Sequence, residues 1–315
     1  MINLLTLERN KIPALIVESG EKTSHRFLEF FTVNIRNLNT RKAYVRAVGC
    51  FLSWCGDRGI GLESIEPITV AAYIEQHPAS PPTVKQHLTA IRMLFDWLVV
   101  GQVVPNNPAT SVRGPKYVVE RGKTPILSKE ETRALLNSID ISTVIGLRDR
   151  ALIGVMVYSF ARVGAVVGMK VEDYYQAGKR WWLRLHEKGG RYHEVPAHHK
   201  LEDFLDTYIR AANIGDDKKS QLFRTTVGKT RKLTENSMYP VDVFRMIRRR
   251  AMKAGILTPI GCHTFRAVGI TNYLDNGGTI ENAQVIAAHR SPRTTKLYDR
   301  TGDQITLDEV ERIVI

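Results

Sequence analysis

The chain has 315 residues, of which 43% are hydrophobic and 24% charged, values typical of a globular protein and too apolar for a disordered chain. Its longest apolar stretch, residues 151–168, is interrupted by Arg162, so the sequence lacks the ~18 uncharged apolar residues that a membrane helix needs. Forty-five Lys and Arg against 32 Asp and Glu give a net charge of +13. An excess of this size favours a polyanionic partner, most often a nucleic acid.

Cysteine content and the N-terminal residues indicate the compartment. Cys50, Cys55 and Cys262 are too few for a disulfide framework, and their spacing is not that of a zinc site. Glu8 and Arg9 fall where a signal peptide would have its apolar core. We therefore expect a cytoplasmic protein, associated with the nucleoid if its partner is DNA, that binds no metal and no membrane.

In the N-terminal part, apolar residues recur at helical spacing over residues 44–55, after Thr40 as the expected N-cap, and over 84–98. Shorter helices are expected near 25–34 and 69–76, which gives a four-helix domain. The polar faces of the two long helices would contact DNA or simply be solvated. These faces carry Arg41, Lys42 and Arg46 on the first helix and Lys85, Gln86, Thr89 and Arg92 on the second.

Residues 101–125 contain four prolines, three glycines and no sustained apolar period, a composition that marks a linker. We expect an N-terminal helical domain over residues 1–105, a linker over 106–124 and a second domain over 125–315. Arg113 and Lys116 would suit a strap along DNA, and a solvated linker is equally consistent with them.

The second domain begins with Ser128 and Glu131, whose spacing is that of a capping box and predicts a helix to about residue 138. A second helix is expected over residues 143–160. Residues 181–195 then alternate in hydrophobicity around Gly189-Gly190, which is typical of a β-hairpin. Further helices are expected over 199–212, 240–254, 263–275, 279–289 and 292–299. The predicted fold is mostly α, with a small β-hairpin or sheet in an α+β second domain.

Motifs for three common chemistries are absent from the sequence, which has no GxxxxGK[ST] loop, no GxSxG and no HExxH. We therefore expect neither a cofactor nor a catalytic metal. Chemistry on DNA would then depend on a protein nucleophile assisted by arginines.

Several residues of the second domain would serve that chemistry, although each has an ordinary alternative. A lone Arg often caps a helix C-terminus, a turn Lys is usually solvated, a His at a helix end favours the dipole, and a Tyr is often half-buried. His263 and Arg266 are three residues apart and so project from one helix face. In chain order the candidates are Arg162, Lys188, His263, Arg266, His289 and Tyr298.

This ordered set resembles the tyrosine recombinases, also called the phage integrase family, over roughly residues 24–300. Residues 263–274, HTFRAVGITNYL, are similar to the family's HxxRHxxAT stretch, and residues 287–300, AAHRSPRTTKLYDR, to its LGHxxxxTTxxYxH stretch. The chain departs from the family at Ala165, where an acidic residue usually follows the first Arg by three positions, and at Ala267, often a His. The partner that would orient Arg162 must therefore come from elsewhere or be missing.

The resemblance implies that Tyr298 attacks a DNA phosphate to form a 3′-phosphotyrosine, and that Lys188 gives a proton to the leaving 5′-oxygen. The two arginines of the set would hold the phosphate from two sides, and the two histidines would add hydrogen bonds. A guanidinium suits this role because it presents a planar fork of donors with a fixed charge. The phenol, with an ordinary pKa near ~10, needs a base or cationic neighbours to lose its proton.

The resemblance further implies a site-specific recombinase carried by a bacterial mobile element. Its two domains would clamp double-stranded DNA that carries paired inverted core sites, as a free monomer that forms a homotetramer in the synapse. Two alternatives stay open: a DNA-binding relative with impaired catalysis, suggested by Ala165, and a type IB-like topoisomerase.

The C-terminal residues predict one more helix, beginning with a capping box at Thr306 and Glu309 and continuing through Val310 and Ile313. This helix would pack on its own domain or, as is common in the family, on a neighbouring subunit. We favour the exchange between subunits, because a polar spacer separates the helix from Tyr298.

Overall fold

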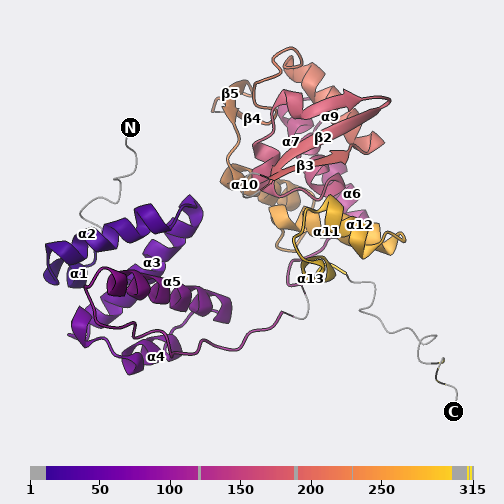
Figure 1. Cartoon of the computed structure of the whole chain (residues 1–315). Coiled ribbons are helices and arrows are strands. Elements are labelled where there is room, and N and C mark those ends of the chain that lie inside the picture. The colour runs from indigo at the N-terminus through magenta and orange to yellow at the C-terminus, as the bar shows by residue number, and fades with distance from the viewer. Residues whose placement is uncertain are drawn as a thin grey trace. The chain divides into compact units, whose positions relative to one another are not determined.

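The computed structural model describes residues 12–119, 122–187, 191–228, 230–299, 311 and 313. The chain divides into two compact units, Met1–Val118 and Val119–Ile315, which Figure 1 shows in indigo to magenta and in magenta to yellow. Lys188 and, except for Glu311 and Ile313, the predicted C-terminal helix lie outside the described residues.

The first unit is built from helices, and the four that the sequence predicts are present. Its longest helices, α3 and α5, pack against each other and bury the Phe51 and Phe95 rings edge to face, with centroids 6.4 Å apart. One additional helix, α1, has only five residues, too few to show a periodic signal. The elements are α1 (Ala14–Glu18), α2 (Glu21–Glu29), a π-helical turn (Phe30–Asn34), α3 (Leu38–Gly56), a 3-10 turn (Leu62–Ser64), α4 (Pro67–Glu75) and α5 (Pro81–Val100).

Helix α3 begins earlier than expected, because its N-cap is Asn37. The Asn37 side chain accepts hydrogen bonds from the backbone N–H groups of Asn39 and Thr40, which an N-cap side chain does for the second and third helical residues. The expected cap at Thr40 is therefore wrong, and Thr40 lies inside the first turn.

The second unit combines helices with two small antiparallel sheets. The expected capping box at Ser128 is confirmed, since the Ser128 and Glu131 side chains each accept a hydrogen bond from the other residue's backbone N–H. The helices are α6 (Lys129–Asn137), α7 (Val144–Tyr158), α8 (Val163–Val167), α9 (His199–Ala212), α10 (Pro240–Lys253), α11 (Cys262–Asp275), α12 (Ile280–Ile286) and α13 (Pro292–Lys296), with a 3-10 turn at Val171–Asp173.

The predicted hairpin is confirmed as β2 (Arg180–Glu187) and β3 (Arg191–Pro196), with Leu185 opposite His193. A strand that the sequence analysis missed, β1 (Tyr174–Ala177), pairs with the other edge of β2. A second missed sheet pairs β4 (Arg224–Thr226) with β5 (Leu233–Ser237). These strands are three to five residues long, too short for a convincing alternation.

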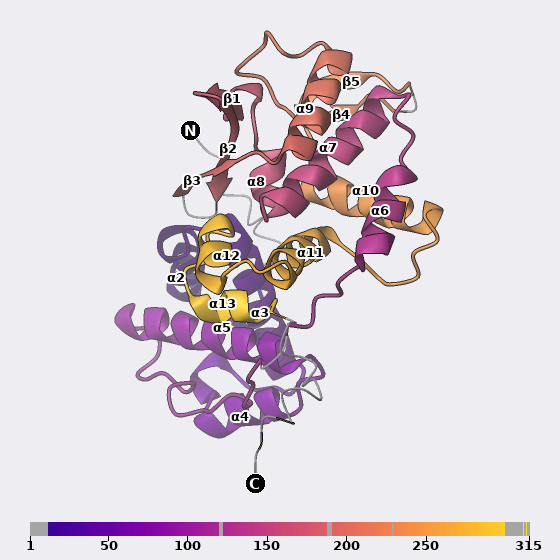
Figure 2. The same ribbon diagram turned by 90° about the vertical axis from the view of Figure 1, so that its right-hand side faces the viewer.

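Helix α7 lies at the centre of the second unit, where it packs against both α9 and α11 (Figure 2). Ala151, Leu152 and Met156 on this helix are fully buried. The close approach of α11 to α7 depends on Gly269. A Cβ at this position would lie 2.1 Å from the carbonyl oxygen of Val157 on α7.

Two arginines of the second unit share one buried carboxylate. Asp149, on α7, is fully buried and accepts hydrogen bonds from the Arg148 and Arg250 guanidiniums, with shortest distances of 2.7 Å to each. Because removing one member of such a set leaves a buried charge without a partner, these residues anchor α10 to α7.

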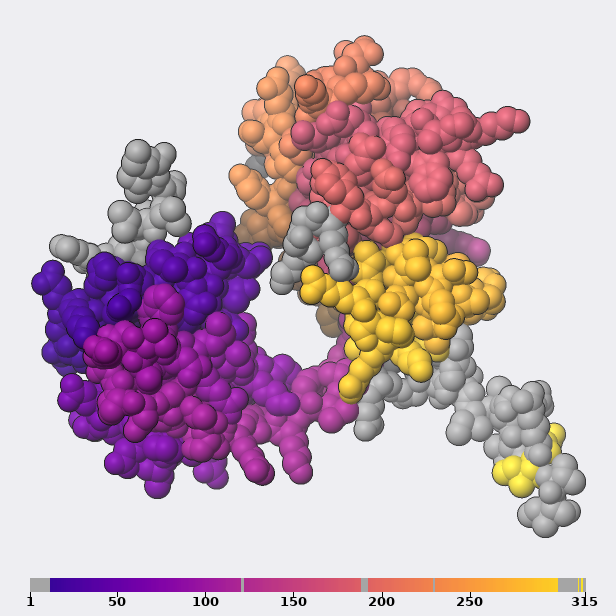
Figure 3. All heavy atoms as spheres, viewed as in Figure 1, coloured from indigo at the N-terminus to yellow at the C-terminus, as the bar shows by residue number. Residues whose placement is uncertain are grey.

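The last two described helices, α12 and α13, pack on each other and form the closely packed yellow body in Figure 3. Helix α12 ends at Ile286, three residues before the predicted end at His289, because Ala288 has φ +47°. That left-handed conformation turns the chain out of the helix. None of the described helices combines the length and hydropathy required to cross a membrane.

Candidate active site

Arg162 lies in the turn between α7 and α8, where it is the N-cap residue of α8. The turn forms because Phe160 adopts φ +54°, so α7 ends at Tyr158, two residues before the predicted end at residue 160, and Arg162 lies beyond the helix. Its Nη1 donates a hydrogen bond of 2.6 Å to Oε2 of Glu187. The Arg162 side chain is 40% exposed and that of Glu187 only 5%, so the pair joins a solvent-accessible cation to a buried carboxylate.

Arg266 lies on α11 and is almost completely buried, with 1% of its surface exposed. Its Nη1 donates to the Phe160 carbonyl and its Nη2 to the Ala287 carbonyl, the latter at 2.6 Å. Its Nε has no hydrogen-bond partner among the described residues. Burial, and then the nearby Arg162 cation, lower the pKa of Arg266 to about 10, so the guanidinium is still charged at neutral pH.

Tyr298 follows α13 and is held by its backbone at two points. Its N–H donates to the Thr295 carbonyl, and its own carbonyl accepts a hydrogen bond from the Thr271 hydroxyl on α11. The side chain is 8% exposed, and its hydroxyl is hydrogen-bonded to Nε2 of His263. Burial raises the pKa of Tyr298, whereas the nearby cations of Arg266 and Arg162 oppose that rise.

The pKa values of the two histidines beside Tyr298 are both lowered. Desolvation and the cations of Arg266 and Arg162 lower the pKa of His263, in the first turn of α11. Burial, followed by Arg266, Arg162 and His263, lowers the pKa of His289 to about 3. Both imidazoles are therefore neutral at pH 7, and each can take part in hydrogen bonds as donor or acceptor.

His289 lies just beyond the left-handed turn that ends α12. Its Nδ1 is 2.9 Å from the Thr295 hydroxyl, and its backbone N–H donates to the Gln284 carbonyl. The His289 ring is parallel to the Tyr298 ring, with centroids 5.7 Å apart and 11° between the planes.

The fold thus brings five of the six candidates into one site. Arg162 comes from the turn before α8, His263 and Arg266 from α11, His289 from the turn after α12, and Tyr298 from the turn after α13. Two guanidiniums and two neutral imidazoles surround one phenol. Such a site can bind a phosphate, and its cations offset part of the cost that burial adds to forming a phenolate.

Two side chains of the hairpin that the sequence analysis did not single out connect it to this site. Glu187, the last residue of β2, binds Arg162. His193, on β3, donates from Nε2 to the Ile286 carbonyl at 2.7 Å. The sequence did contain a signal for Glu187. It follows Leu183 and Leu185 at every second position of the strand, and both leucines are fully buried. Because every second side chain of a strand points to the same face, this alternation predicts that the Glu187 carboxylate is buried as well.

The candidate DNA-contacting residues of the first unit fall into two groups. Arg41 donates from Nε and Nη2 to the Ile35 carbonyl, and Arg92 donates to the carbonyls of Ala109 and Val112, so both guanidiniums support the local backbone. The others are exposed, although the Thr89 hydroxyl donates to the Lys85 carbonyl of its own helix. They are Lys42, Arg46, Lys85, Gln86, Thr89, Arg113 and Lys116.

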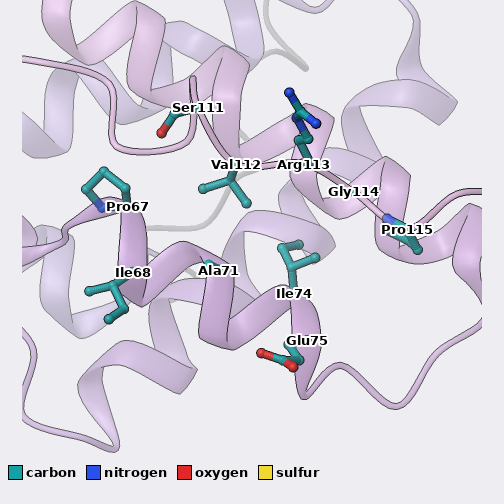
Figure 4. A pocket seen from close by; sticks show the side chains of 10 residues that line it. All are labelled: Pro67, Ile68, Ala71, Ile74, Glu75, Ser111, Val112, Arg113, Gly114 and Pro115. Atoms are coloured by element: carbon teal, nitrogen blue, oxygen red, sulfur yellow. The ribbon is translucent and has the colours of Figure 1, made fainter.

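Among the described residues no group of three or more His, Cys, Asp or Glu side chains is placed to hold a metal ion. The first unit also contains an open groove of about 670 Å³ between α4 and residues 111–115 (Figure 4). Ile68, Ala71 and Val112 line it, and none of the candidate catalytic residues does.

Comparison with known proteins places the chain in a family. Residues 125–304, more than half of the chain, match the model of the phage integrase family. The tyrosine recombinase XerD of Ralstonia nicotianae is 29% identical over 273 residues, covering 82% of this chain and 83% of that protein. The tyrosine recombinase XerC of Leptospira interrogans is 26% identical and covers 91% of each chain.

Solved structures show the same fold at low sequence identity. The site-specific recombinase XerH in a post-cleavage complex with palindromic difH has a TM-score of 0.69 and 16% identity, covering 97% of this chain and 88% of its own. A lambda integrase tetramer bound to a Holliday junction has a TM-score of 0.66 and 19% identity, covering 90% of this chain and 80% of its own.

Proposed function

Because the chain belongs to the phage integrase family, the tyrosine recombinases that break and rejoin DNA, we propose that Tyr298 is the nucleophile of a site-specific strand exchange. The observation that carries this proposal is the position of its phenol. The hydroxyl is hydrogen-bonded to a neutral His263, with the Arg266 cation beside it.

In the proposed reaction the Tyr298 oxygen forms a bond to the scissile phosphorus, and the bond from phosphorus to the 5′-oxygen breaks. His263 accepts the phenol proton through Nε2. Arg162 and Arg266 stabilise the phenolate and the charge on the nonbridging phosphate oxygens. Lys188 donates a proton to the departing 5′-oxygen. The reverse attack by a 5′-hydroxyl restores the phosphodiester, so the bond energy is conserved.

His289 would bind the phosphate as a neutral donor. When the Thr295 hydroxyl donates to Nδ1, the ring proton resides on Nε2, which is then able to donate to a nonbridging oxygen. The low pKa of His289 supports this role. If the imidazole were protonated, Nδ1 would carry a proton and could no longer accept the hydrogen bond from the Thr295 hydroxyl.

The finer parts of the proposal concern assembly and origin. The chain would act in the cytoplasm on paired inverted core sites, with its two units around the DNA and four copies in the synapse, as lambda integrase forms a tetramer on a Holliday junction. Lys42, Arg46, Lys85, Gln86, Thr89, Arg113 and Lys116 would face the DNA. A bacterial mobile element as the carrier of the gene is a separate proposal. Inverted repeats in the DNA that flanks the gene would identify a candidate core site.

The test is covalent trapping. Nicked duplexes taken from inverted repeats in the flanking DNA release a short fragment after cleavage, so the covalent complex accumulates and is visible on a denaturing gel. The adduct should map to Tyr298 and vanish in Tyr298→Phe, while Tyr273→Phe, a tyrosine of α11 in the same unit, should keep it. An adduct on another tyrosine would refute the assignment.

The same assay separates the alternatives. DNA binding without any adduct in the wild-type chain would indicate an impaired relative. Relaxation of supercoiled plasmids that lack every candidate site would indicate a topoisomerase.

A further inference from the structure

The side chain of Ala165, on α8 three residues after Arg162, offers no carboxylate and is buried. A carboxylate reaches Arg162 from a different element, because Glu187 at the end of β2 accepts the 2.6 Å hydrogen bond from its Nη1. The two residues are 25 positions apart. The contact therefore depends on the packing of β2 against α8, which are neighbours in the fold.

The burial of Glu187 shows that its carboxylate is committed to this contact. Its side chain is 5% exposed, and it lies on the same face of β2 as the fully buried Leu183 and Leu185. A carboxylate so far from water requires a cationic partner, and a short bond from a guanidinium is among the strongest that a protein offers.

The pair also affects the second arginine. The Arg162 cation lowers the pKa of Arg266, and the Glu187 carboxylate raises it, so Glu187 offsets the repulsion between the two guanidiniums. A guanidinium has five N–H donors, and the bond to Glu187 uses one on Nη1. The Arg162 side chain, 40% exposed, can therefore be fixed by Glu187 and still bind an anion.

We propose that Glu187 is the positioning residue of Arg162 and supplies from β2 the carboxylate that α8 lacks at Ala165. The inference rests on the proposed function, since Arg162 must hold the scissile phosphate for its orientation to matter. By the same contact, the end of β2 is fixed to the turn before α8.

The test compares Glu187→Gln with the wild-type chain in single-turnover cleavage of the trapping duplex. The amide keeps the shape of the side chain and removes its charge. A misplaced guanidinium should slow cleavage on the order of 10²-fold, while the Kd for DNA and the melting temperature of the free protein stay near those of the wild type. The matched control is Glu194→Gln, which removes an exposed carboxylate paired with Arg184 in the same sheet and should cleave normally.

A second substrate shows whether Glu187 acts through Arg162. Replacing one nonbridging oxygen of the scissile phosphate by a methyl group removes the negative charge that Arg162 would hold. With separated diastereomers of this methylphosphonate, the Glu187→Gln defect should be roughly tenfold smaller in at least one of them. A side chain needed only for folding would give the same defect on every substrate.

Two results would overturn the proposal: cleavage by Glu187→Gln within about twofold of wild type, or equal defects on phosphate and methylphosphonate. If Glu187→Gln does not fold, Glu187→Asp, which is shorter and still charged, allows the same comparison of substrates. If Glu187 does not position Arg162, the wild-type chain still forms the covalent adduct at Tyr298. If the proposed function is wrong, the wild-type chain forms no adduct at Tyr298.

Discussion

The rings of His289 and Tyr298 lie parallel, 5.7 Å apart, and the buried imidazole has a pKa of about 3. Burial, followed by the cations of Arg266 and Arg162, keeps His289 neutral beside the phenol. In an unfolded chain the same imidazole titrates near its ordinary ~6.5. Folding therefore excludes a proton from His289 throughout the interval between these values.

The first prediction concerns acid stability. Because the folded pKa of His289 is depressed, the unfolded chain binds more protons below pH ~6.5, and the free energy of unfolding falls as the pH is lowered toward 3. Between pH 7 and 4.5 this residue should account for a loss of about 2 kcal/mol. Urea unfolding should show a smaller loss in His289→Gln than in the wild type; equal losses would contradict the prediction.

The second prediction separates basic residues that contact DNA from those that support the backbone. Lys85→Ala should reduce the slope of log Kd against log salt concentration by about 0.9 and leave the melting temperature unchanged, because Lys85 is exposed. Arg92→Ala should instead destabilise the protein by about 1.5–3 kcal/mol, because its guanidinium bonds two backbone carbonyls. Titrations at several salt concentrations, with thermal melts of both variants, distinguish the roles. Identical behaviour of the two variants would refute the division.

Lys188 lies outside the described residues, so its role is tested by chemistry alone. Lys188→Ala should slow cleavage of an ordinary duplex and should be rescued by a duplex whose leaving atom is a bridging 5′-sulfur. A thiolate leaves without a proton, which makes the general acid dispensable. Single-turnover rates on both duplexes check this, and equal defects would show that Lys188 is not the acid.

Gly269→Ala should destabilise the second unit by at least about 1–3 kcal/mol, because the new Cβ would lie 2.1 Å from the Val157 carbonyl oxygen and force α7 and α11 apart. Gly164→Ala on α8 is the control, since its Cβ would meet nothing within 4 Å, and it should leave stability equal or slightly higher. Thermal unfolding without DNA compares them. A stable Gly269→Ala protein would show that the two helices can separate at little cost.

The final prediction concerns the C-terminal residues. A helix of about ten residues does not persist alone in water, so its apolar side must dock. If it docks on a neighbouring copy, deletion from Thr306 onward leaves the melting temperature of the monomer unchanged and reduces tetramer formation on DNA. Calorimetry of the free protein and the size of the DNA complex measure the two effects. A destabilised monomer with normal tetramers would refute exchange between subunits.

The sequence alone was enough to place most elements and to order the candidate catalytic residues. Ser128 and Glu131 marked a helix start because a capping box is a local arrangement of hydrogen bonds. Helix α9 matched its expected range, His199–Ala212, because its apolar period continues without interruption. The pair His263 and Arg266 was recognisable because helical geometry places residues three apart on one face.

The tertiary structure decided which charged side chains already have hydrogen-bond partners within the protein. Arg92 resembles the exposed basic residues around it in sequence, yet its guanidinium bonds the Ala109 and Val112 carbonyls, which only the folded chain brings near. Glu187 and Arg162 are 25 residues apart and meet because β2 packs against α8. The physical reason is common to both cases. Local periodicity follows from backbone geometry, whereas the partner of a buried charge depends on how distant elements pack together.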